Sequence, residues 1–152
     1  TKYMAQTHLS LHVHLVFHTR DNRKSIKEEW RKQLHAFLGG CLKTANCVPE
    51  AVGGTNDHIH ILAGFRATHC IADVVKDIKV ASSKWVHNEI GHRMFAWQGG
   101  YGAITVSPSQ IPRVKNYIAN QMEHHNVKSA KDEYVEMLDA AGVEYDEKYL
   151  WI

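Results

Sequence analysis

Cysteine is scarce in this chain: there are three among 152 residues, and none forms a CxxC pair. An odd number of separated cysteines argues against a disulfide framework and against a structural zinc cluster built on cysteine. Long apolar runs are lacking too. None approaches the ~20 residues that a helix needs to cross a bilayer, and no charged-then-apolar leader precedes Leu9. We therefore expect reduced cysteines, no membrane partner and a cytoplasmic location.

Internal repeats, linkers and low-complexity segments are also lacking, so no feature divides the chain into domains. The hydrophobic share of 44% and the charged share of 22% are those of an ordinary globular protein. A chain of this length can bury about two thirds of its unfolded surface in one core. We expect a single domain over residues 1–152, in which residues from about 129 onward form a C-terminal extension.

Net charge is small at +2, but it is unevenly distributed. Residues 1–110 carry 13 Lys/Arg against 8 Asp/Glu, whereas residues 111–152 carry 5 against 8. A basic body is compatible with a nucleic-acid partner, although solvated surfaces often show such an excess. Histidine, in contrast, is abundant: the chain has 12, more than packing usually requires, and several fall into patterns.

The most informative pattern lies in residues 53–62, which read Gly-Gly-Thr-Asn-Asp-His-Ile-His-Ile-Leu. The glycines end the preceding segment, Asn-Asp is typical of a turn, and the alternation that follows predicts a strand. Residues two apart on a strand share a face, so His58 and His60 project together while Ile59 and Ile61 point to the core. Such a pair could hold a cation, or it could be the polar face of a half-buried strand.

Hydrophobic periodicity predicts the other elements, with a period of two for strands and of 3.6 for helices. In chain order we expect a strand over 8–18, a helix over about 26–45, strands over 48–52 and 58–65, a helix over about 70–90, a bent strand over 95–107, a helix from Ser109, and a shorter helix over 129–141 that Gly142 ends.

The first six elements have the order strand, helix, strand, strand, helix, strand. This is the split βαβ order of ferredoxin-like domains, an α+β fold in which an antiparallel sheet carries two helices on one face. Such a sheet leaves its other face open. We expect His58 and His60 to stand on that open face.

The helix that follows Ser109, our expected N-cap, carries the second candidate group. Tyr117 and Gln121 are one helical turn apart and lie on the same side. We expect this catalytic helix to lie over the open face. There the Tyr117 phenol can attack a phosphorus atom, while the two histidines and the Gln121 amide oxygen hold a cation that polarises the phosphate. The stripe that contains them is Arg113, Tyr117, Gln121 and His124, and the packing stripe beside it is Ile111, Val114, Ile118, Met122 and His125.

Three motifs in this order carry a resemblance to a known family. The chain resembles the single-tyrosine HUH transposases of small insertion sequences with hairpin ends, including their repeat-associated relatives. The motifs are Gly53-Gly54-x-x-Asp57-His58-Ile59-His60-Ile61-Leu62, Phe95-Ala96-Trp97-Gln98-x-Gly100-Tyr101-Gly102-Ala103 and Tyr117-Ile118-x-x-Gln121-x-x-His124-His125, and the similarity runs over nearly all of the chain.

The resemblance implies a transposase that nicks single-stranded DNA at hairpin ends, keeps the 5′ end as a phosphotyrosine on Tyr117 and rejoins strands by the reverse attack. It implies that His58, His60 and Gln121 bind Mg²⁺ or Mn²⁺, without a nucleotide cofactor. Because histidine is an atypical ligand of magnesium, manganese could be the better cofactor in vitro. It also implies a homodimer in a bacterial or archaeal cell, close to the nucleoid. Whether the Tyr117 helix completes its own site or the partner's stays open.

Several basic side chains are candidates for contacts with DNA phosphates. Ordinary surface charge is the alternative for each of them. They are Lys79, Lys84, Arg93 and Arg113.

Some further residues keep two interpretations. Trp97 and Tyr101 could stack on bases or pack in the core. Asp57 could order its turn or accept a hydrogen bond from a ligand histidine. The first predicted strand carries His12 and His14, which we expect on an outward polar face. No role follows from the sequence for His124 and His125.

Two other functions compete with the transposase interpretation. One is a non-catalytic module that binds hairpin DNA or RNA on the same scaffold. The other is a hydrolytic metal phosphodiesterase whose nucleophile is water. The complete set of Tyr117, His58, His60 and Gln121 argues against the loss of catalysis.

Overall fold

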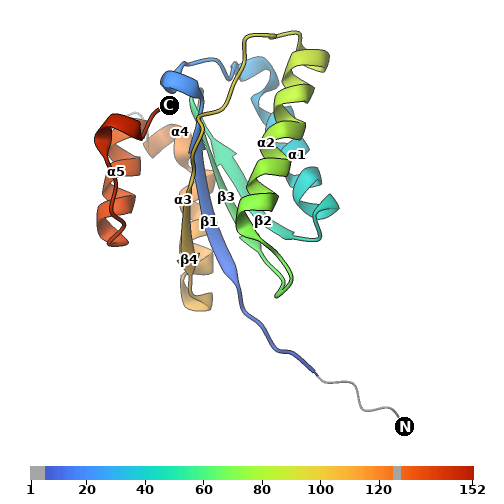
Figure 1. Ribbon diagram of the computed structural model, residues 1–152, viewed down its shortest axis with the longest axis vertical. Coiled ribbons are helices and arrows are strands. Elements are labelled where there is room, and N and C mark those ends of the chain that lie inside the picture. Colours follow the sequence, from blue (N-terminus) through green and yellow to red (C-terminus); the bar gives the residue numbers. More distant parts are fainter. Residues whose placement is uncertain (1–5, 125–127) are drawn as a thin grey trace.

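The computed structural model describes residues 6–124 and 128–152. Its centre is a four-stranded antiparallel sheet with the order β2-β3-β1-β4 (Figure 1). The α+β class is confirmed, and the strand order agrees with the predicted split βαβ arrangement. The strands are β1 (His12–His18), β2 (Val48–Gly54), β3 (His58–Gly64) and β4 (Gly102–Val106).

Helices cover both faces of this sheet (Figure 1). Short 3-10 or π-helical turns lie at Arg20–Asn22, Val86–Ile90, Pro108–Gln110 and Glu147–Tyr149. Within the described residues, no helix is both long enough and apolar enough to span a bilayer. The helices are α1 (Glu28–Thr44), α2 (Ile71–Trp85), α3 (Ile111–Ala119), α4 (Gln121–His124) and α5 (Ala130–Ala140).

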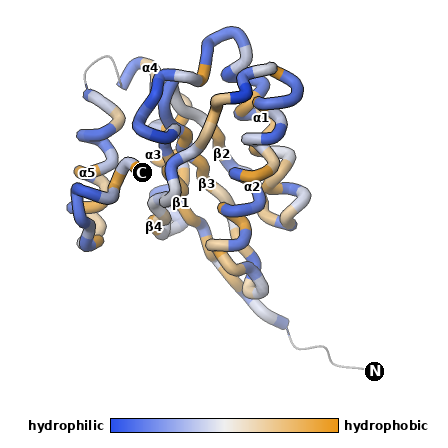
Figure 2. Tube along the Cα trace, turned by 45° about the horizontal axis from the view of Figure 1, so that its top comes forward, coloured by the Kyte–Doolittle hydropathy of each residue, from blue (hydrophilic) through white to orange (hydrophobic). Residues whose placement is uncertain are grey.

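The main hydrophobic core lies between one face of the sheet and helices α1 and α2. The central strands supply alternate residues to it, such as Leu15 of β1 and Ile61 of β3, both fully buried. Figure 2 shows hydrophobic residues running along these strands. Each such side chain stabilises the fold by about 1.5–3 kcal/mol when it leaves water. On α1, the stripe facing this core is Trp30, Leu34, Leu38 and Leu42.

The second face of the sheet is covered by the helix that carries Tyr117, as predicted, and also by α5, which the sequence interpretation did not place there. Helices α3 and α5 lie over it (Figure 1). Gly53 of β2 permits the close approach of α3, because a Cβ atom there would lie 2.4 Å from the carbonyl oxygen of Ile118. Val16 of β1 packs against Tyr134 and Leu138 of α5. Side chains on this face are thus buried between the sheet and the helices.

The predicted strands are longer than the observed ones at two places. The first begins at His12, not at His8. The last is confined to β4, and the segment before it makes only an isolated bridge between Trp97 and Thr19. The Gln98 amide still donates to the His18 oxygen at the end of β1, whereas the Gly99 amide donates to the Ile152 oxygen, outside the sheet.

The helix that carries Tyr117 also differs from the prediction. A 3-10 turn precedes it, so α3 begins at Ile111 with Gln110 as the N-cap residue, and Ser109 is not the cap. Asn120 has non-helical dihedral angles and separates α3 from α4. His125 lies outside the described residues.

The helix predicted over 129–141 agrees closely with α5. Helix α5 has Ser129 as its N-cap, whose side chain accepts a hydrogen bond from the Asp132 amide. The helix ends before Gly142, which has a φ of 68°. The tail then docks on the loop before β4, where the Gln98 side chain donates to the Leu150 oxygen at 2.8 Å.

Candidate active site

The two histidines of β3 share one face, as the alternation predicts. His58 and His60 are both fully buried, and their ring centroids lie 5.1 Å apart. Their neighbours Ile59 and Ile61 belong to the hydrophobic core on the other side of the sheet. The pair therefore faces α3 and α5 and is shielded from solvent by them.

Two side chains from the preceding turn orient His58. Its Nδ1 lies 2.8 Å from Asp57 Oδ1 and 3.0 Å from Thr55 Oγ1. Burial alone would raise the pKa of Asp57, but hydrogen bonding with His58 and Thr55 holds it below its usual value. When Nδ1–H donates to this carboxylate, His58 Nε2 carries the lone pair and can act as a metal ligand. Asp57 thus has hydrogen bonds both within its turn, from Thr55, and with His58.

His60 is oriented by another histidine. Its Nδ1 lies 2.8 Å from Nε2 of His14 on β1. Burial, followed in size by the neighbouring His60, lowers the pKa of His14 to about 3, and burial lowers that of His60 to about 4. Both rings are therefore neutral at pH 7, the form in which histidine binds metals.

The prediction that His14 lies on an outward polar face is wrong. Its exposed fraction is 7%, because α3 covers this part of the sheet and the Tyr117 ring centroid lies 6.3 Å from that of His14. His12 is half-buried and pairs with Glu50 of β2 at 2.9 Å, so it takes no part in this group.

Tyr117 and Gln121 reach the histidine pair within a single chain. Gln121 is buried, and its Oε1 lies 2.9 Å from His58 Nε2. The Tyr117 ring centroid lies 5.6 Å from that of His60. The helix break at Asn120 does not separate the two residues, since the Gln121 amide donates to the Tyr117 carbonyl oxygen at 3.3 Å.

The sequence interpretation missed Glu133, which α5 brings into the same group. Its carboxylate is 2% exposed, with Oε1 2.7 Å from His60 Nε2 and 3.7 Å from His58 Nε2. Its Oε2 accepts a hydrogen bond from the Tyr117 hydroxyl and lies 3.3 Å from His124 Nε2. Acidic residues are common in the first turn of any helix, so the sequence carries no signal that singles out Glu133.

These residues could hold a divalent metal ion. One ligand atom from each of His58, His60 and Glu133 lies within 4.8 Å of the others. The Gln121 amide oxygen lies beside them, which gives two nitrogen and two oxygen donors. Carboxylate and carbonyl oxygens suit Mg²⁺ and Mn²⁺, and the two imidazoles favour Mn²⁺ of these.

The Tyr117 phenol is held in its neutral form in this arrangement. Burial, and then the hydrogen bond to Glu133 and its negative charge, raise the pKa of Tyr117 well above its usual range. A cation bound at the neighbouring histidines would oppose this shift, because an adjacent positive charge favours the phenolate.

The four predicted phosphate contacts lie outside this group. Lys79 is engaged within the protein: its ammonium donates to the carbonyl oxygens of Gln98 and Gly100, and burial lowers its pKa to about 8. Lys84, Arg93 and Arg113 are exposed.

Trp97 and Tyr101 both contact the hydrophobic core, as one of their two interpretations has it. Trp97 is 6% exposed, packs edge-on against Phe17 at 4.8 Å between centroids, and donates its indole N–H to Ser82. Tyr101 is half-buried against the same core. A buried indole presents no free face for a DNA base.

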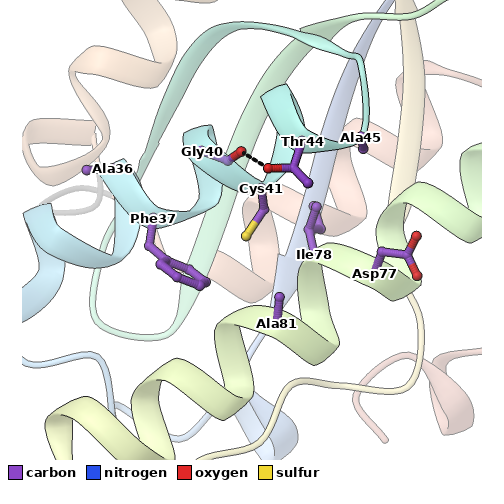
Figure 3. Close-up of a pocket in the computed structure, with 9 residues that line it drawn as sticks. All are labelled: Ala36, Phe37, Gly40, Cys41, Thr44, Ala45, Asp77, Ile78 and Ala81. Carbon is purple, nitrogen blue, oxygen red and sulfur yellow. Dashed lines mark hydrogen bonds between the residues drawn. The ribbon is translucent and has the colours of Figure 1, made fainter.

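A hollow of about 690 Å³ between α1 and α2 has a mostly apolar lining, which includes Phe37, Cys41 and Ile78 (Figure 3). Size alone would suggest a ligand site there. It lies on the opposite side of the sheet from the histidines, however, and none of the predicted site residues lines it. The candidate catalytic residues therefore lie on the covered second face, away from this hollow.

Comparison with known proteins agrees with this geometry. Residues 7–121 match the model of the family described as "Transposase IS200 like". Among solved structures, the chain is similar to a protein of Deinococcus radiodurans R1 that is provisionally described as a transposase, with 24% identity and a TM-score of 0.64 over 80% of this chain and 98% of that one. It is also similar to a REP-associated tyrosine transposase bound to a REP hairpin, with 14% identity and a TM-score of 0.59 over 100% of this chain and 91% of that one. No curated protein matches the chain.

The family match spans most of the chain, and the two solved structures share its fold. The chain therefore belongs to the IS200-like transposase family. It is an enzyme of the DNA transposase class, as its resemblance to single-tyrosine transposases implied.

Proposed function

We propose that this transposase nicks and rejoins single-stranded DNA through a covalent bond between Tyr117 and the 5′ phosphate. One observation carries the proposal. The Tyr117 ring and the Gln121 amide oxygen both lie beside the buried pair of His58 and His60 within one chain. A phenol beside a candidate metal site is the arrangement that phosphoryl transfer to tyrosine requires.

In the proposed first step, the Tyr117 oxygen forms a bond to the scissile phosphorus and the bond from phosphorus to the 3′ oxygen breaks. The phenol gives up its proton and the departing 3′ oxygen gains one, so the products are a 5′-phosphotyrosine and a 3′-hydroxyl. The tyrosyl ester retains the energy of the original phosphodiester. Attack of another 3′-hydroxyl on it rejoins strands without a nucleotide cofactor.

The other residues of the site bind and orient. In this proposal His58, His60 and Gln121 hold the divalent cation, which when bound polarises the phosphate oxygen. Asp57 and His14 accept hydrogen bonds from the outer nitrogens of the two histidines and so keep the Nε2 atoms facing inward. Tyr117 supplies the nucleophile. Magnesium or manganese is the expected ion, with manganese favoured by the two imidazoles.

The proposed substrate is single-stranded DNA that carries a hairpin end. The relative whose structure contains a REP hairpin supports this choice. A hollow of about 370 Å³ beside α2 supports a DNA contact near Lys84, since the described residues that line it include Arg20 and His87 but no acidic side chain. Arg93 and Arg113 remain proposed phosphate contacts, while Lys79 has its ammonium already engaged.

We further propose that the protein acts as a homodimer in the cytoplasm of a bacterial or archaeal cell, where its DNA substrate lies in the nucleoid. The Tyr117 helix already covers the histidines of its own chain. A dimer is therefore not required to complete this site.

The test is a search for a covalent adduct. The protein is incubated with Mn²⁺ or Mg²⁺ and a labelled single strand that carries a hairpin, then denatured and separated by electrophoresis. We expect an adduct that withstands denaturation in the wild type and in Tyr149→Phe, a control at an exposed tyrosine, but not in Tyr117→Phe.

The same assay separates the two competing functions. Cleavage that continues undiminished in Tyr117→Phe would identify a hydrolase with water as its nucleophile. Hairpin binding without any cleavage in several metals would leave only a binding module. Either result would overturn the proposed mechanism.

A further inference from the structure

We propose that Glu133 is a fourth ligand of the metal and that it also holds the Tyr117 hydroxyl in place. One carboxylate would then link the metal to the nucleophile. The inference rests on the proposed function and adds to it a residue that neither the sequence motifs nor the family match includes.

The surroundings of Glu133 point to a ligand role. A carboxylate buried in a protein interior needs hydrogen-bonding or positively charged groups around it, since an unpaired charge there is costly. The contacts of Glu133 include His58, His60, His124 and Tyr117. These are the candidate metal ligands, the candidate nucleophile and one adjacent imidazole. A divalent cation bound between the two imidazoles and this carboxylate would bring a positive charge next to the buried negative one.

The two oxygens of Glu133 face different partners. Its Oε1 lies 2.7 Å from His60 Nε2 and 3.7 Å from His58 Nε2, on the side where both imidazoles present ligand atoms. Its Oε2 accepts the hydrogen bond from the Tyr117 hydroxyl. The carboxylate therefore lies between the histidine pair and the phenol. If Oε1 binds the metal, Oε2 holds the phenol oxygen near the ion, with the carboxylate group between the two.

The position of Glu133 is firmly set by packing of α5. On the same helix, Tyr134 and Leu138 pack against Val16 of the sheet. The carbonyl oxygen of Ala130 faces Nε2 of His18 at 3.4 Å, and Ser129 caps the helix. The extension thus docks on the same strands that carry the histidines, and it places one acidic side chain among them.

This contribution comes from outside the part of the chain that defines the family. The family match ends at residue 121, and Glu133 lies beyond it. Within residues 7–121 the candidate donors are two imidazoles and one amide. A carboxylate adds the negative charge that strengthens the binding of hard divalent cations. The C-terminal extension then supplies a metal ligand to the active site.

The test measures Mn²⁺ binding without DNA. Free Mn²⁺ is quantified by electron paramagnetic resonance while the full chain is titrated, for wild type, Glu133→Gln and Glu136→Gln. Glu136 is an exposed acid on the same helix, paired with Lys128, and serves as the matched control. We expect the affinity to fall about 10- to 100-fold in Glu133→Gln, as for disrupted metal sites in general. In Glu136→Gln the Mn²⁺ affinity should stay within about 2-fold of that of the wild type, a much smaller change than in Glu133→Gln.

A second variant keeps the inference testable if Glu133→Gln does not fold. Glu133→Asp retains the charge on a side chain shorter by one methylene, so Mn²⁺ binding should be partly restored. The hydrogen bond to Tyr117 should nevertheless be lost, because the shorter side chain cannot reach both the metal and the Tyr117 hydroxyl. We therefore expect this variant to lower the rate of adduct formation at saturating Mn²⁺ more than it lowers the Mn²⁺ affinity.

Unchanged or tighter Mn²⁺ binding in Glu133→Gln would overturn the inference. Tighter binding would show that the carboxylate competes with the metal. Loss of binding in Glu136→Gln as well would also overturn it, since the effect would then be one of general charge. Failure of the proposed function is recognised separately. A wild type that binds Mn²⁺ through Glu133 but forms no adduct on Tyr117 would refute the transposition chemistry and leave the metal site intact.

Discussion

The two faces of the sheet are both buried, yet they are built in opposite ways. One face carries aliphatic side chains such as Leu15, Ile59 and Ile61 and packs against α1 and α2. The other carries His14, His18, His58 and His60, the polar residues next to them in the same strands, under α3 and α5. Burial by itself therefore does not separate the structural face from the functional one. The two faces differ in that each buried ring nitrogen on the histidine face needs a hydrogen-bond partner.

This difference has an energetic consequence. Apolar contacts are non-directional, so the first face stabilises the fold roughly in proportion to the area that it buries. Hydrogen bonds on the second face add little net stability, but a buried polar group without its hydrogen bond is costly. This face therefore determines where its side chains lie more than it adds to the stability of the fold. Substitutions on the two faces should accordingly affect different measurements.

The largest effect on stability is expected from the apolar face. Ile61→Ala removes a fully buried side chain and should lower the free energy of unfolding by about 2–5 kcal/mol. The measurement is urea unfolding, with the exposed Val48→Ala as a control that should change it by less than about 0.5 kcal/mol. Mn²⁺ binding should persist while the variant stays folded. A cost below about 1 kcal/mol would mean that this face is not the main source of stability.

The histidine face should make stability sensitive to acid. Burial is the main cause that lowers the pKa of His18 and His60 to about 4, so these rings stay neutral in the folded state while the unfolded chain takes up protons below about 6.5. Their contribution is complete above about pH 6.5 and is lost as the pH falls toward about 4, at about 1.4 kcal/mol per pH unit for each histidine.

Urea unfolding at pH 7.5, 6 and 5 measures this loss. In His18→Phe the slope of the unfolding free energy against pH should be shallower by the contribution of one histidine, because phenylalanine does not titrate. Unfolding free energies that stay level between pH 7.5 and 5 would contradict the lowered pKa values.

A smaller effect is expected where the helix of Tyr117 meets the sheet. Gly53→Ala places a methyl group 2.4 Å from the Ile118 carbonyl oxygen and 2.8 Å from its Cγ2, so α3 must move away from β2. We expect a cost of about 1–3 kcal/mol in unfolding free energy, typical of overpacking. Adduct formation should fall further than this, because Tyr117 and Gln121 move with the helix.

Gly40→Ala is the matched control for this prediction. A Cβ atom at Gly40 meets nothing within 4 Å, and the residue lies inside α1. Alanine there should stabilise the helix by up to about 1 kcal/mol and leave adduct formation unchanged. Equal behaviour of the two variants would show that the approach of α3 at Gly53 does not matter.

The smallest effect is expected from exposed basic side chains that belong to neither face of the sheet. Lys84→Ala and Arg93→Ala should each weaken binding of a single strand a few-fold, and each should reduce the slope of log affinity against log salt by about 0.7 if the residue contacts one phosphate. Lys43→Ala, an exposed lysine on α1, is the control. Slopes that stay equal to the wild type in both variants would identify Lys84 and Arg93 as ordinary surface charge.

The parts of the site that the sequence predicted are those that depend on neighbours in the chain. A period of two places His58 and His60 on one face, and a spacing of four places Tyr117 beside Gln121. The family motifs added the expectation that these pairs meet. The role of His14 was missed because its partner His60 lies 46 residues away, and Glu133 was missed because it lies 73 residues from His60.

The sequence by itself determined the periodic features: the strands, the helices, the alternation of aliphatic and histidine side chains and the membership of the family. Only the tertiary structure decided that α5 docks on the second face beside the Tyr117 helix and that a carboxylate stands between the imidazoles and the phenol. The physical reason is the range of the forces involved. Periodicity follows from local backbone geometry, whereas the contact between two polar side chains depends on how every intervening element packs.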